Sequence, residues 1–347
     1  MGKIVVVGDA YVSVATLSEA VKEMQLPEPL EIQGFEWEST CSMTEFQEKV
    51  RIIEEGGPEA VTLPVGILEA MPEADYLFVH IAPVSQAMLQ AAPNLKLIGT
   101  CRGGVEHLAM EEIRQRELPV LHVIRNAEPV ADFTIGLMYA VTRNIALAHA
   151  AAMRGEWLKV FPNDAYKTTL SQQTVALIGL GHVGKLVAKR LNSLGVPVMA
   201  YDPFTDEKAL KKAGIDVKLV DLETAFSQAK IVSLHLRVTP ETTNLIDQRY
   251  LKLMQPNAYL INTARPAVLE KQAFMEVLRN HQIAGAAIDV VWQEPIAPDD
   301  PLLELDNLTI TSHIAGDTVD AIPRSPFLLK DVVNSYLEQG ESDMLIK

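Results

Sequence analysis

TVALIGLGHVGKLVAKRLNSLGVPVMAYD, residues 174–202, is the stretch that most strongly predicts the fold. It begins with a short apolar strand, continues with a helical pattern that stops at Gly195, and closes with a second strand that ends at Asp202. The turn between the first strand and the helix is GLGHVG, residues 179–184. A GxGxxG turn in this context is typical of a βαβ unit that binds a dinucleotide.

Each glycine of this turn has its own expected role. Gly179 permits the tight turn, Gly181 lets the backbone approach a pyrophosphate, and Gly184 lets the helix pack close to the strand. The backbone N–H groups of His182 and Val183 open the helix and would face the phosphates. A strand–helix turn that binds no nucleotide is the structural alternative.

Asp202 stands 18 residues after the third glycine. A carboxylate at the end of this strand would accept hydrogen bonds from the adenosine ribose and would repel a 2′-phosphate. The sequence therefore predicts NAD rather than NADP as the cofactor.

Length, charge and cysteine content narrow the class of protein. The chain has 347 residues, enough for two domains, and a net charge of −15, which disfavours nucleic acid and acidic membranes as partners. The two cysteines give neither a disulfide framework nor zinc spacing, so no metal is predicted. The N-terminus lacks a signal-peptide pattern, and no apolar run is long enough for a membrane span, so a cytoplasmic location is expected.

Short Val- and Ile-rich runs alternate with helical patterns along nearly the whole chain, as in α/β proteins with parallel sheets. Residues 130–155 are expected to form one long helix, and the last 30 residues to be helical. The expected strands are 3–9, 30–36, 75–81, 95–101 and 119–124 in the first part, and 174–179, 196–202, 217–220, 230–236, 258–264, 284–290 and 308–313 in the second.

Three chemically active residues each follow a predicted strand of the second part: Arg265, Glu294 and His313. Ligands of open α/β sheets bind outside the carboxyl ends of the strands, so a cation, a carboxylate and an imidazole should converge there. Imidazole suits proton transfer near neutral pH, a carboxylate on its other nitrogen fixes the tautomer, and arginine offers a fork that matches a carboxylate. Taken singly, each residue could be only a polar cap, a turn residue or a surface ion-pair partner.

Several ordered segments extend this pattern, and together they resemble the D-isomer-specific 2-hydroxyacid dehydrogenases. The resemblance spans roughly residues 75–320. It rests on LIGTCRGGVEHL, RNAEPVADFTIGLM, VALIGLGHVGKLVAKRL, SLHLRVTPETTNLI, LINTARPAVLEKQAF, AGAAIDVVWQEP and LTITSHIAG.

The resemblance implies roles for individual residues. Arg265 would bind the substrate carboxylate and polarise the carbonyl, His313 would be the general acid/base, and Glu294 its partner. Gly103 and Gly104 would hold the substrate carboxylate through backbone amides. The cofactor residues that it implies are His235, Leu236, Arg237, Thr239, Thr263, Ala264, Asp289, His313 and Gly316, with Asp289 facing the nicotinamide carboxamide.

The chain departs from the family pattern at a few positions. Pro266 follows the arginine where relatives usually have glycine, and Arg237 stands where many have proline. Gly103 replaces a larger residue, which would leave room for a larger substrate. Arg102 beside it is a hypothetical binding group for a second anion. The other histidines, including His80 and His107, are taken as structural.

The family implies two Rossmann-like or flavodoxin-like βα domains with a cleft between them. We expect a substrate-binding domain at 1–125 plus 317–347, an NAD-binding domain at 126–316, a hinge near Asn126 and Gly316, and a homodimer. The expected function is an NAD-dependent oxidoreductase acting on a small 2-keto or D-2-hydroxy acid. The alternative is an NAD(H)-sensing corepressor on the same scaffold. Phosphoglycerate oxidation stays possible, and formate oxidation is disfavoured because it requires no acid/base pair.

Overall fold

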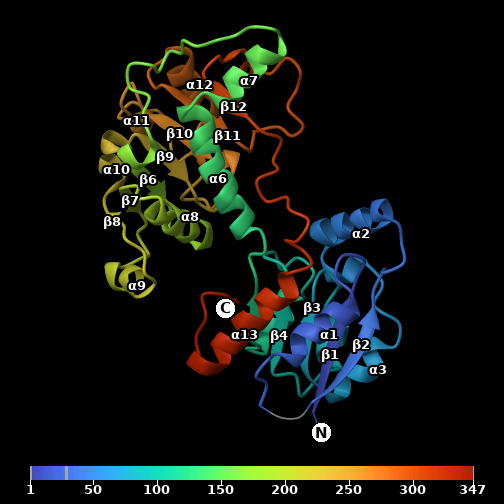
Figure 1. Ribbon diagram of the computed structural model, residues 1–347. Helices are drawn as coiled ribbons and strands as arrows, with labels where there is room; N and C mark the ends of the chain where they lie inside the picture. The colour runs from blue at the N-terminus through green and yellow to red at the C-terminus, as the bar shows by residue number, and fades with distance from the viewer. Residues whose placement is uncertain (1, 28–29, 347) are drawn as a thin grey trace. The chain divides into compact units, whose positions relative to one another are not determined.

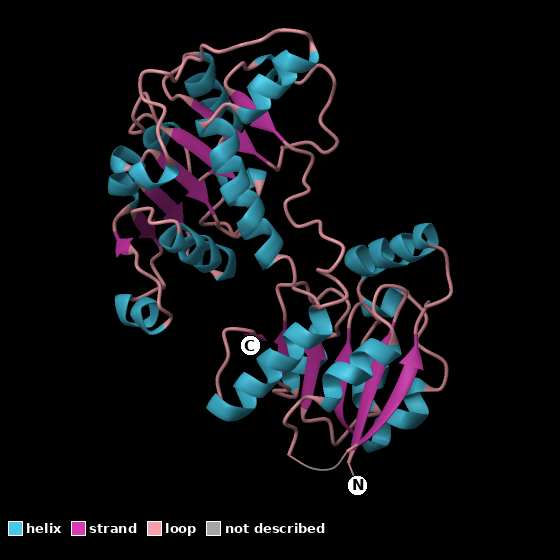
Figure 2. Ribbon diagram, in the orientation of Figure 1, coloured by secondary structure: helices cyan, strands magenta, loops and turns pink. Residues whose placement is uncertain are grey.

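The computed structural model describes residues 2–27 and 30–346, and these divide into two compact units. Unit 1 comprises Met1–Arg125 and Thr318–Lys347, and unit 2 comprises Asn126–Asp317. Each unit is a central sheet with helices on both faces (Figures 1 and 2). The first and last residues of the expected substrate-binding domain, 1 and 347, lie outside the described residues. No helix in the described part of the chain is long and apolar enough to cross a membrane.

Unit 2 has a parallel seven-stranded sheet in the order β12-β11-β10-β9-β6-β7-β8. Counted along the unit, its first six strands lie in the order 3-2-1-4-5-6, which is the dinucleotide-binding arrangement. The strands are β6 (Val175–Ile178), β7 (Val198–Tyr201), β8 (Lys218–Leu219), β9 (Ile231–Leu234), β10 (Tyr259–Asn262), β11 (Gly285–Ile288) and β12 (Leu308–Ile310).

Successive residues of the buried strands in unit 2 supply two separate cores. Val175 and Leu177 of β6 pack with one set of helices, and Ala176 and Ile178 pack with the other. Because both faces are covered, these strands are predominantly apolar, as the sequence analysis expected. One face carries α6 (Ala127–Thr142), α8 (His182–Ser193) and α9 (Glu207–Lys212), and the other α10 (Leu222–Gln228), α11 (Gln248–Leu251) and α12 (Lys271–Arg279).

Unit 1 has a six-stranded sheet in the order β13-β5-β4-β3-β1-β2. Its five parallel strands follow the flavodoxin-like order 2-1-3-4-5. The prediction of α/β domains with parallel sheets is confirmed. The strands are β1 (Lys3–Gly8), β2 (Glu31–Glu36), β3 (Ala74–Val79), β4 (Leu97–Thr100), β5 (Val120–His122) and β13 (Leu345–Ile346).

The helices of unit 1 also cover both faces of its sheet. Ile4 and Val6 pack with α1 (Val14–Lys22) and α13 (Ser325–Gln339), whereas Val5 and Val7 pack on the opposite face. The opposite face carries α2 (Met43–Gly56), α3 (Ile67–Ala70), α4 (Gln86–Gln90) and α5 (Met110–Gln115).

Two expectations about helices are wrong. The single helix expected over 130–155 is two helices, α6 and α7 (Ile145–Met153), because Asn144 takes a left-handed conformation with φ 55°. Its Nδ2 donates to Asn163 Oδ1 at 2.8 Å, which satisfies the side chain at the break. The C-terminal residues are not all helical either, since β13 pairs antiparallel with β5 through Leu345 and Leu121.

Candidate active site

Arg265 lies in the turn after β10, and the buried side chain of Asn262 holds that turn. Asn262 Oδ1 accepts a hydrogen bond from the Ala264 N–H at 3.0 Å, and its Nδ2 donates to the Arg265 carbonyl at 3.1 Å. Arg265 is exposed, and its Nη1 donates to the Ala264 carbonyl at 2.7 Å. The amide thus fixes the backbone and leaves the guanidinium accessible. Sequence analysis missed Asn262, although it opens the same Asn-Thr-Ala-Arg motif.

The loop that carries His313 is anchored by the buried carboxylate of Asp289, which directly follows β11. Asp289 Oδ1 accepts from the Thr311 hydroxyl at 2.5 Å and from the Ile314 N–H at 3.0 Å, while Oδ2 accepts from the Ala315 N–H at 2.8 Å. Three of roughly four acceptor positions of the carboxylate are therefore in use. A contact with the nicotinamide carboxamide would have to share these oxygens.

His313 and Glu294, predicted as an acid/base pair, are in contact. His313 Nδ1 lies 2.8 Å from Glu294 Oε2, and Glu294 Oε1 accepts from the Val291 N–H at 3.3 Å. With Nδ1–H donating to the carboxylate, Nε2 is left to exchange a proton with a ligand. Both side chains are partly open to solvent, at 45% and 41% exposure, so a substrate can reach the imidazole.

The charges around Glu294 link all three predicted catalytic residues. The pKa of Glu294 is lowered, chiefly by the hydrogen bond from His313, with smaller contributions from the Val291 N–H and from the charges of His313 and Arg265. The carboxylate therefore stays ionised and keeps the imidazole in one tautomer. His313 itself has φ 58°, a left-handed conformation unusual for a residue with a side chain.

The three glycines after β6 are needed for different physical reasons. Gly179 has φ 100°, and a Cβ there would lie 2.8 Å from the His235 carbonyl oxygen. A Cβ on Gly184 would collide with the carbonyl oxygen of Gly179. A Cβ on Gly181, the N-cap of α8, would meet none of the described atoms within 4 Å. The protein's own packing thus requires two of the glycines, and the third leaves the open space that an approaching pyrophosphate needs.

Asp202 directly follows β7, as the dinucleotide unit requires. Its Oδ2 accepts from the Leu180 N–H at 2.7 Å, and its Oδ1 accepts from the Phe204 N–H at 2.9 Å. The carboxylate thereby ties the glycine turn to the end of β7, and it retains acceptor positions for ribose hydroxyls. His182 and Val183 form the first turn of α8.

The other predicted cofactor residues lie after β9 and β10 or beside the His313 loop. The Thr263 hydroxyl contacts the Thr134 hydroxyl at 2.7 Å, which joins β10 to α6. His235 bonds through Nε2 to the Ser233 hydroxyl at 3.0 Å, and its Nδ1 is buried without a partner among the described residues. Burial lowers the pKa of His235 to about 4, so its ring is neutral. The remaining predicted positions, Leu236, Arg237, Thr239, Ala264 and Gly316, also belong to unit 2.

The predicted substrate residues Arg102, Gly103 and Gly104 belong to unit 1, in the loop after β4. His122 Nδ1 bonds to the Gly103 carbonyl at 3.0 Å. Arg102 Nη2 contacts Glu54 at 2.9 Å and Glu106 at 3.6 Å. Arg102 is therefore already an ion-pair partner, which the sequence did not predict.

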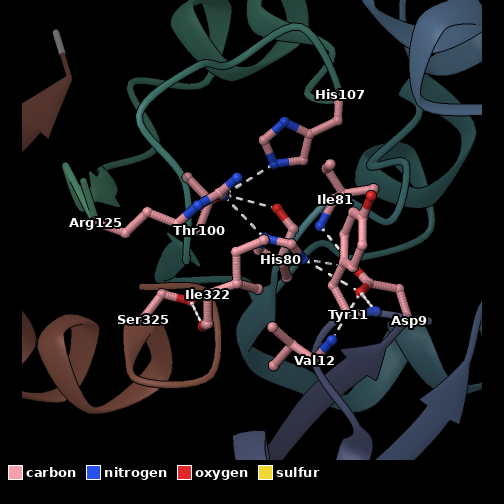
Figure 3. A network of polar contacts seen from close by, with 10 residues as sticks. All are labelled: Asp9, Tyr11, Val12, His80, Ile81, Thr100, His107, Arg125, Ile322 and Ser325. Atoms are coloured by element: carbon pink, nitrogen blue, oxygen red, sulfur yellow. Dashed lines mark hydrogen bonds and ion pairs between the residues drawn. The ribbon is translucent and has the colours of Figure 1, made fainter. Parts of the chain in front are cut away.

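A buried polar network at the carboxyl end of the unit 1 sheet was missed (Figure 3). Asp9 directly follows β1, His80 directly follows β3, and His80 joins Asp9 to Arg125. His107 bonds to the Thr100 hydroxyl at 2.9 Å in the same network. Both Asp9 and His80 directly follow a strand, as Arg265 does, so the same sequence pattern marks them in the first third of the chain. Among the described residues, no group of three or more metal-binding side chains is placed to hold a metal ion.

Comparisons with known proteins show which family this chain resembles. The family model "D-isomer specific 2-hydroxyacid dehydrogenase, NAD binding domain" matches residues 135–315. Glyoxylate reductase from Thermofilum pendens is 38% identical over 247 residues, which are 70% of this chain and 71% of that protein. Glycerate dehydrogenase from Methylorubrum extorquens is 31% identical over 287 residues, which are 80% and 88% of the two chains.

Two further relatives define the limits of the likeness. D-3-phosphoglycerate dehydrogenase from Archaeoglobus fulgidus is 34% identical over 253 residues, which are 72% of this chain but only 47% of that protein. The chain thus spans about half the length of that relative. The NAD-complexed D-isomer-specific 2-hydroxyacid dehydrogenase from Lactobacillus delbrueckii matches this chain with a TM-score of 0.69 at 20% identity. The match covers 99% of this chain and 100% of that one. That likeness shows a shared fold.

The chain belongs to the D-isomer-specific 2-hydroxyacid dehydrogenase family, because the family model covers more than half of it. NAD is the cofactor of the matched domain, and the open space at Gly181 fits that assignment. The relatives described above are dehydrogenases and a reductase, and they give no support to the corepressor alternative.

Proposed function

We propose that this protein interconverts a small D-2-hydroxy acid and its 2-keto acid, using NAD. The observation that carries the proposal is the 2.8 Å contact between His313 and Glu294, with Arg265 close enough to lower the pKa of Glu294. NAD, when bound, accepts or supplies the hydride. Oxidation also requires that a base remove the hydroxyl proton, and reduction requires that an acid return it.

His313 performs the proton transfer in this proposal. Its Nε2 takes the hydroxyl proton in oxidation and donates it to the keto oxygen in reduction, while Glu294 holds Nδ1–H throughout. Arg265 binds the substrate carboxylate through its planar fork and stabilises negative charge on the reacting oxygen. Asn262 and Asp289 are positioning residues, because each fixes the backbone beside a catalytic side chain.

The two units take different roles in the proposal. Unit 2 contains the matched NAD-binding domain and the three catalytic residues. Unit 1 recognises the substrate, with the Gly103–Gly104 loop supplying backbone amides. Asn126 and Gly316 are the proposed hinge. A cytoplasmic location remains a prediction.

We also propose a homodimer, because apolar side chains are exposed along one segment of unit 2. Ile145 and Met153 of α7 are 55% and 75% exposed, and Trp157 and Val160, which follow in the chain, are 82% and 80% exposed. Apolar groups gathered in this way are typical of an interaction surface. Light scattering should give the mass of two chains, and Trp157→Glu should shift it toward one. A monomeric wild type would refute this proposal.

A matched pair of histidine substitutions tests the enzymatic proposal. His313 and His281 both have positive φ, 58° and 48°, and asparagine tolerates that conformation. NADH oxidation is followed at 340 nm with a panel of 2-keto acids, with NADPH as a control. His313→Asn should lower kcat on the order of 100-fold or more, whereas the exposed His281→Asn should not. Full turnover by His313→Asn, or NADH binding without turnover of any acid by the wild type, would contradict the proposal.

A further inference from the structure

The sheet of unit 1 has a topological switch point between β1 and β3, from which the strand order runs outward in both directions. In open α/β sheets, ligands bind outside the carboxyl ends of the strands at such a point. Asp9 follows β1 and His80 follows β3, so both stand at this position (Figure 3). The sequence analysis took His80 as structural and gave Asp9 no role.

Asp9 and His80 form a buried pair with a defined protonation pattern. Asp9 is 3% exposed and His80 is fully buried. His80 Nδ1 lies 3.0 Å from Asp9 Oδ2, and Asp9 also accepts backbone N–H groups from Tyr11, Val12 and Ile81. Burial lowers the pKa of His80, and the Asp9 carboxylate only partly opposes it. The ring is therefore neutral, with Nδ1–H donating to Asp9.

Arg125 is bonded to His80 of this pair, and none of the described carboxylates forms an ion pair with it. Its Nη1 donates to His80 Nε2 at 2.9 Å, so its hydrogen-bond acceptor is an uncharged ring. Arg125 is partly buried, and no ion pair with it occurs among the described residues. Its pKa is lowered by burial and by the charge of Arg102. A partly buried cation is normally paired with an anion, and none of the described residues provides one in direct contact with Arg125.

Arg102 is the second cation at this end of the sheet. Its Nη2 contacts Glu54 and Glu106, whose side chains are 47% and 46% exposed. Its Nη1 is buried and has no partner within the described part of the chain. Arg102 and Arg125 follow the adjacent parallel strands β4 and β5, so both lie at the same edge of the sheet. In agreement with this placement, the charge of Arg102 lowers the pKa of both Arg125 and His80. Glu54 and Glu106 are open to water, which screens their attraction and lets a ligand compete.

We infer that Arg125 and Arg102 form a subsite for a second oxyanion of the substrate, a carboxylate or a phosphate beyond the 2-keto acid group. The inference rests on the proposed function and specifies its substrate class. Guanidinium forks suit either oxyanion, because each presents paired N–H donors. Asp9 and His80 are positioning residues: Asp9 orients the His80 ring, and the ring accepts a hydrogen bond from the Arg125 guanidinium.

Substrate pairs that differ only at the far end test the subsite. One pair is 2-oxohexanoate, which ends in a methyl group, and 2-oxopentanedioate, which ends in a carboxylate. The other is hydroxypyruvate and its 3-phosphate. The wild type should have the higher kcat/KM for the anionic member of at least one pair, and the pair that responds identifies the oxyanion.

Arg125→Gln and Arg102→Gln should each reduce that preference by about 10- to 100-fold, the effect of losing a charge-assisted hydrogen bond. Arg51→Gln is the matched control, because Arg51 is an exposed arginine of α2 that pairs with Glu48 and Glu55 of the same helix. A preference that is absent in the wild type, or unchanged in Arg125→Gln, would overturn the subsite and leave the proposed function standing.

Direct binding separates failure of the subsite from failure of the proposed function. If no 2-keto acid is turned over, calorimetry with succinate and with inorganic phosphate decides the question, with NAD present to occupy its own phosphate-binding turn. Binding by the wild type and by Arg51→Gln, but not by Arg125→Gln, would support the subsite without the enzymatic proposal. No binding by the wild type would overturn it.

The positioning role of His80 has its own readout. Glutamine can donate to Asp9 and accept from Arg125, whereas leucine can do neither. His80→Leu should raise KM for the anionic acid at least 10-fold more than His80→Gln does, since removing one partner leaves the other buried group unsatisfied. Equal KM values in folded variants would overturn the positioning role.

Discussion

In the glycine turn after β6, a glycine-to-alanine substitution can affect cofactor binding at one position and stability at another. At Gly184, a new Cβ would collide with the carbonyl oxygen of Gly179, which is a backbone atom and cannot swing away. At Gly181, a new Cβ would meet none of the described atoms within 4 Å, and the backbone there has φ −66° and ψ −161°, which alanine also adopts. The same substitution should therefore have different consequences at two positions three residues apart.

The expected magnitudes follow from these contacts. Overpacking at Gly184→Ala should cost about 1–3 kcal/mol of unfolding free energy. At about 2–4 °C per kcal/mol for a unit of this size, Tm should fall by roughly 2–12 °C. Gly181→Ala should change the unfolding free energy by no more than about 0.5 kcal/mol. It should instead weaken NADH binding about 10- to 100-fold, because the methyl group keeps the pyrophosphate from the N–H groups of α8.

Two assays on the same protein samples test this reasoning. Thermal unfolding without cofactor gives Tm, and nicotinamide fluorescence gives the Kd of NADH. The expected result is a stable Gly181→Ala that binds NADH poorly and a Gly184→Ala with a lowered Tm. A Gly181→Ala with wild-type Kd would refute the placement of the pyrophosphate at this turn. A large loss of Tm in Gly181→Ala would refute the argument from open space.

Two further predictions concern buried polar groups. Asp289→Asn replaces one carboxylate oxygen with an amide N–H, which then faces the N–H of either Ala315 or Ile314. An unsatisfied buried N–H costs about 1–3 kcal/mol, so kcat should fall about 5- to 150-fold as the His313 loop loosens. A wild-type kcat would exclude Asp289 as a positioning residue. His235 titrates near 6.5 when unfolded and at about 4 in the fold, so it binds fewer protons when folded and contributes stability above pH 6.5 that is lost as the pH falls toward 4. Although His235 is partly exposed, its Nδ1 is fully buried. The free energy of unfolding should therefore fall by roughly 3 kcal/mol over this pH range. Urea unfolding at pH 7 and pH 4.5 should show a smaller loss in His235→Gln than in the wild type, and equal losses would contradict the assignment.

The sequence predicted the parallel sheets because their signal is local. Buried strands such as Val175–Ile178 and Gly285–Ile288 are continuous apolar runs bounded by turns, and such runs need no partner to be recognised. The break between α6 and α7 escaped prediction because Asn144 sits in an otherwise helical pattern with no internal Pro. Its side chain donates to Asn163, which lies 19 residues later. β13 was missed because a two-residue strand carries no periodicity and exists only by pairing with β5.

The same distinction applies to the candidate site. Arg265, Glu294 and His313 could be singled out because each follows a strand and carries reactive chemistry. The residues that hold them, Asn262 and Asp289, act through backbone groups in neighbouring turns, and those contacts become visible only when the chain is folded. Positioning contacts of this kind have no spacing rule, so the sequence marks the reactive groups better than their supports.

The histidine–carboxylate pairs Glu294–His313 and Asp9–His80 differ in burial, and this difference separates their roles. In the Glu294–His313 pair both side chains are more than two-fifths exposed, so Nε2 can reach a ligand and exchange a proton. In the Asp9–His80 pair both are buried, and Nε2 already accepts from Arg125. Protonating His80 would place two cations in contact in a site of low polarity, which burial and Arg125 both oppose. The exposed pair is therefore suited to move a proton, and the buried pair is suited to hold an arginine in one orientation for a negatively charged group.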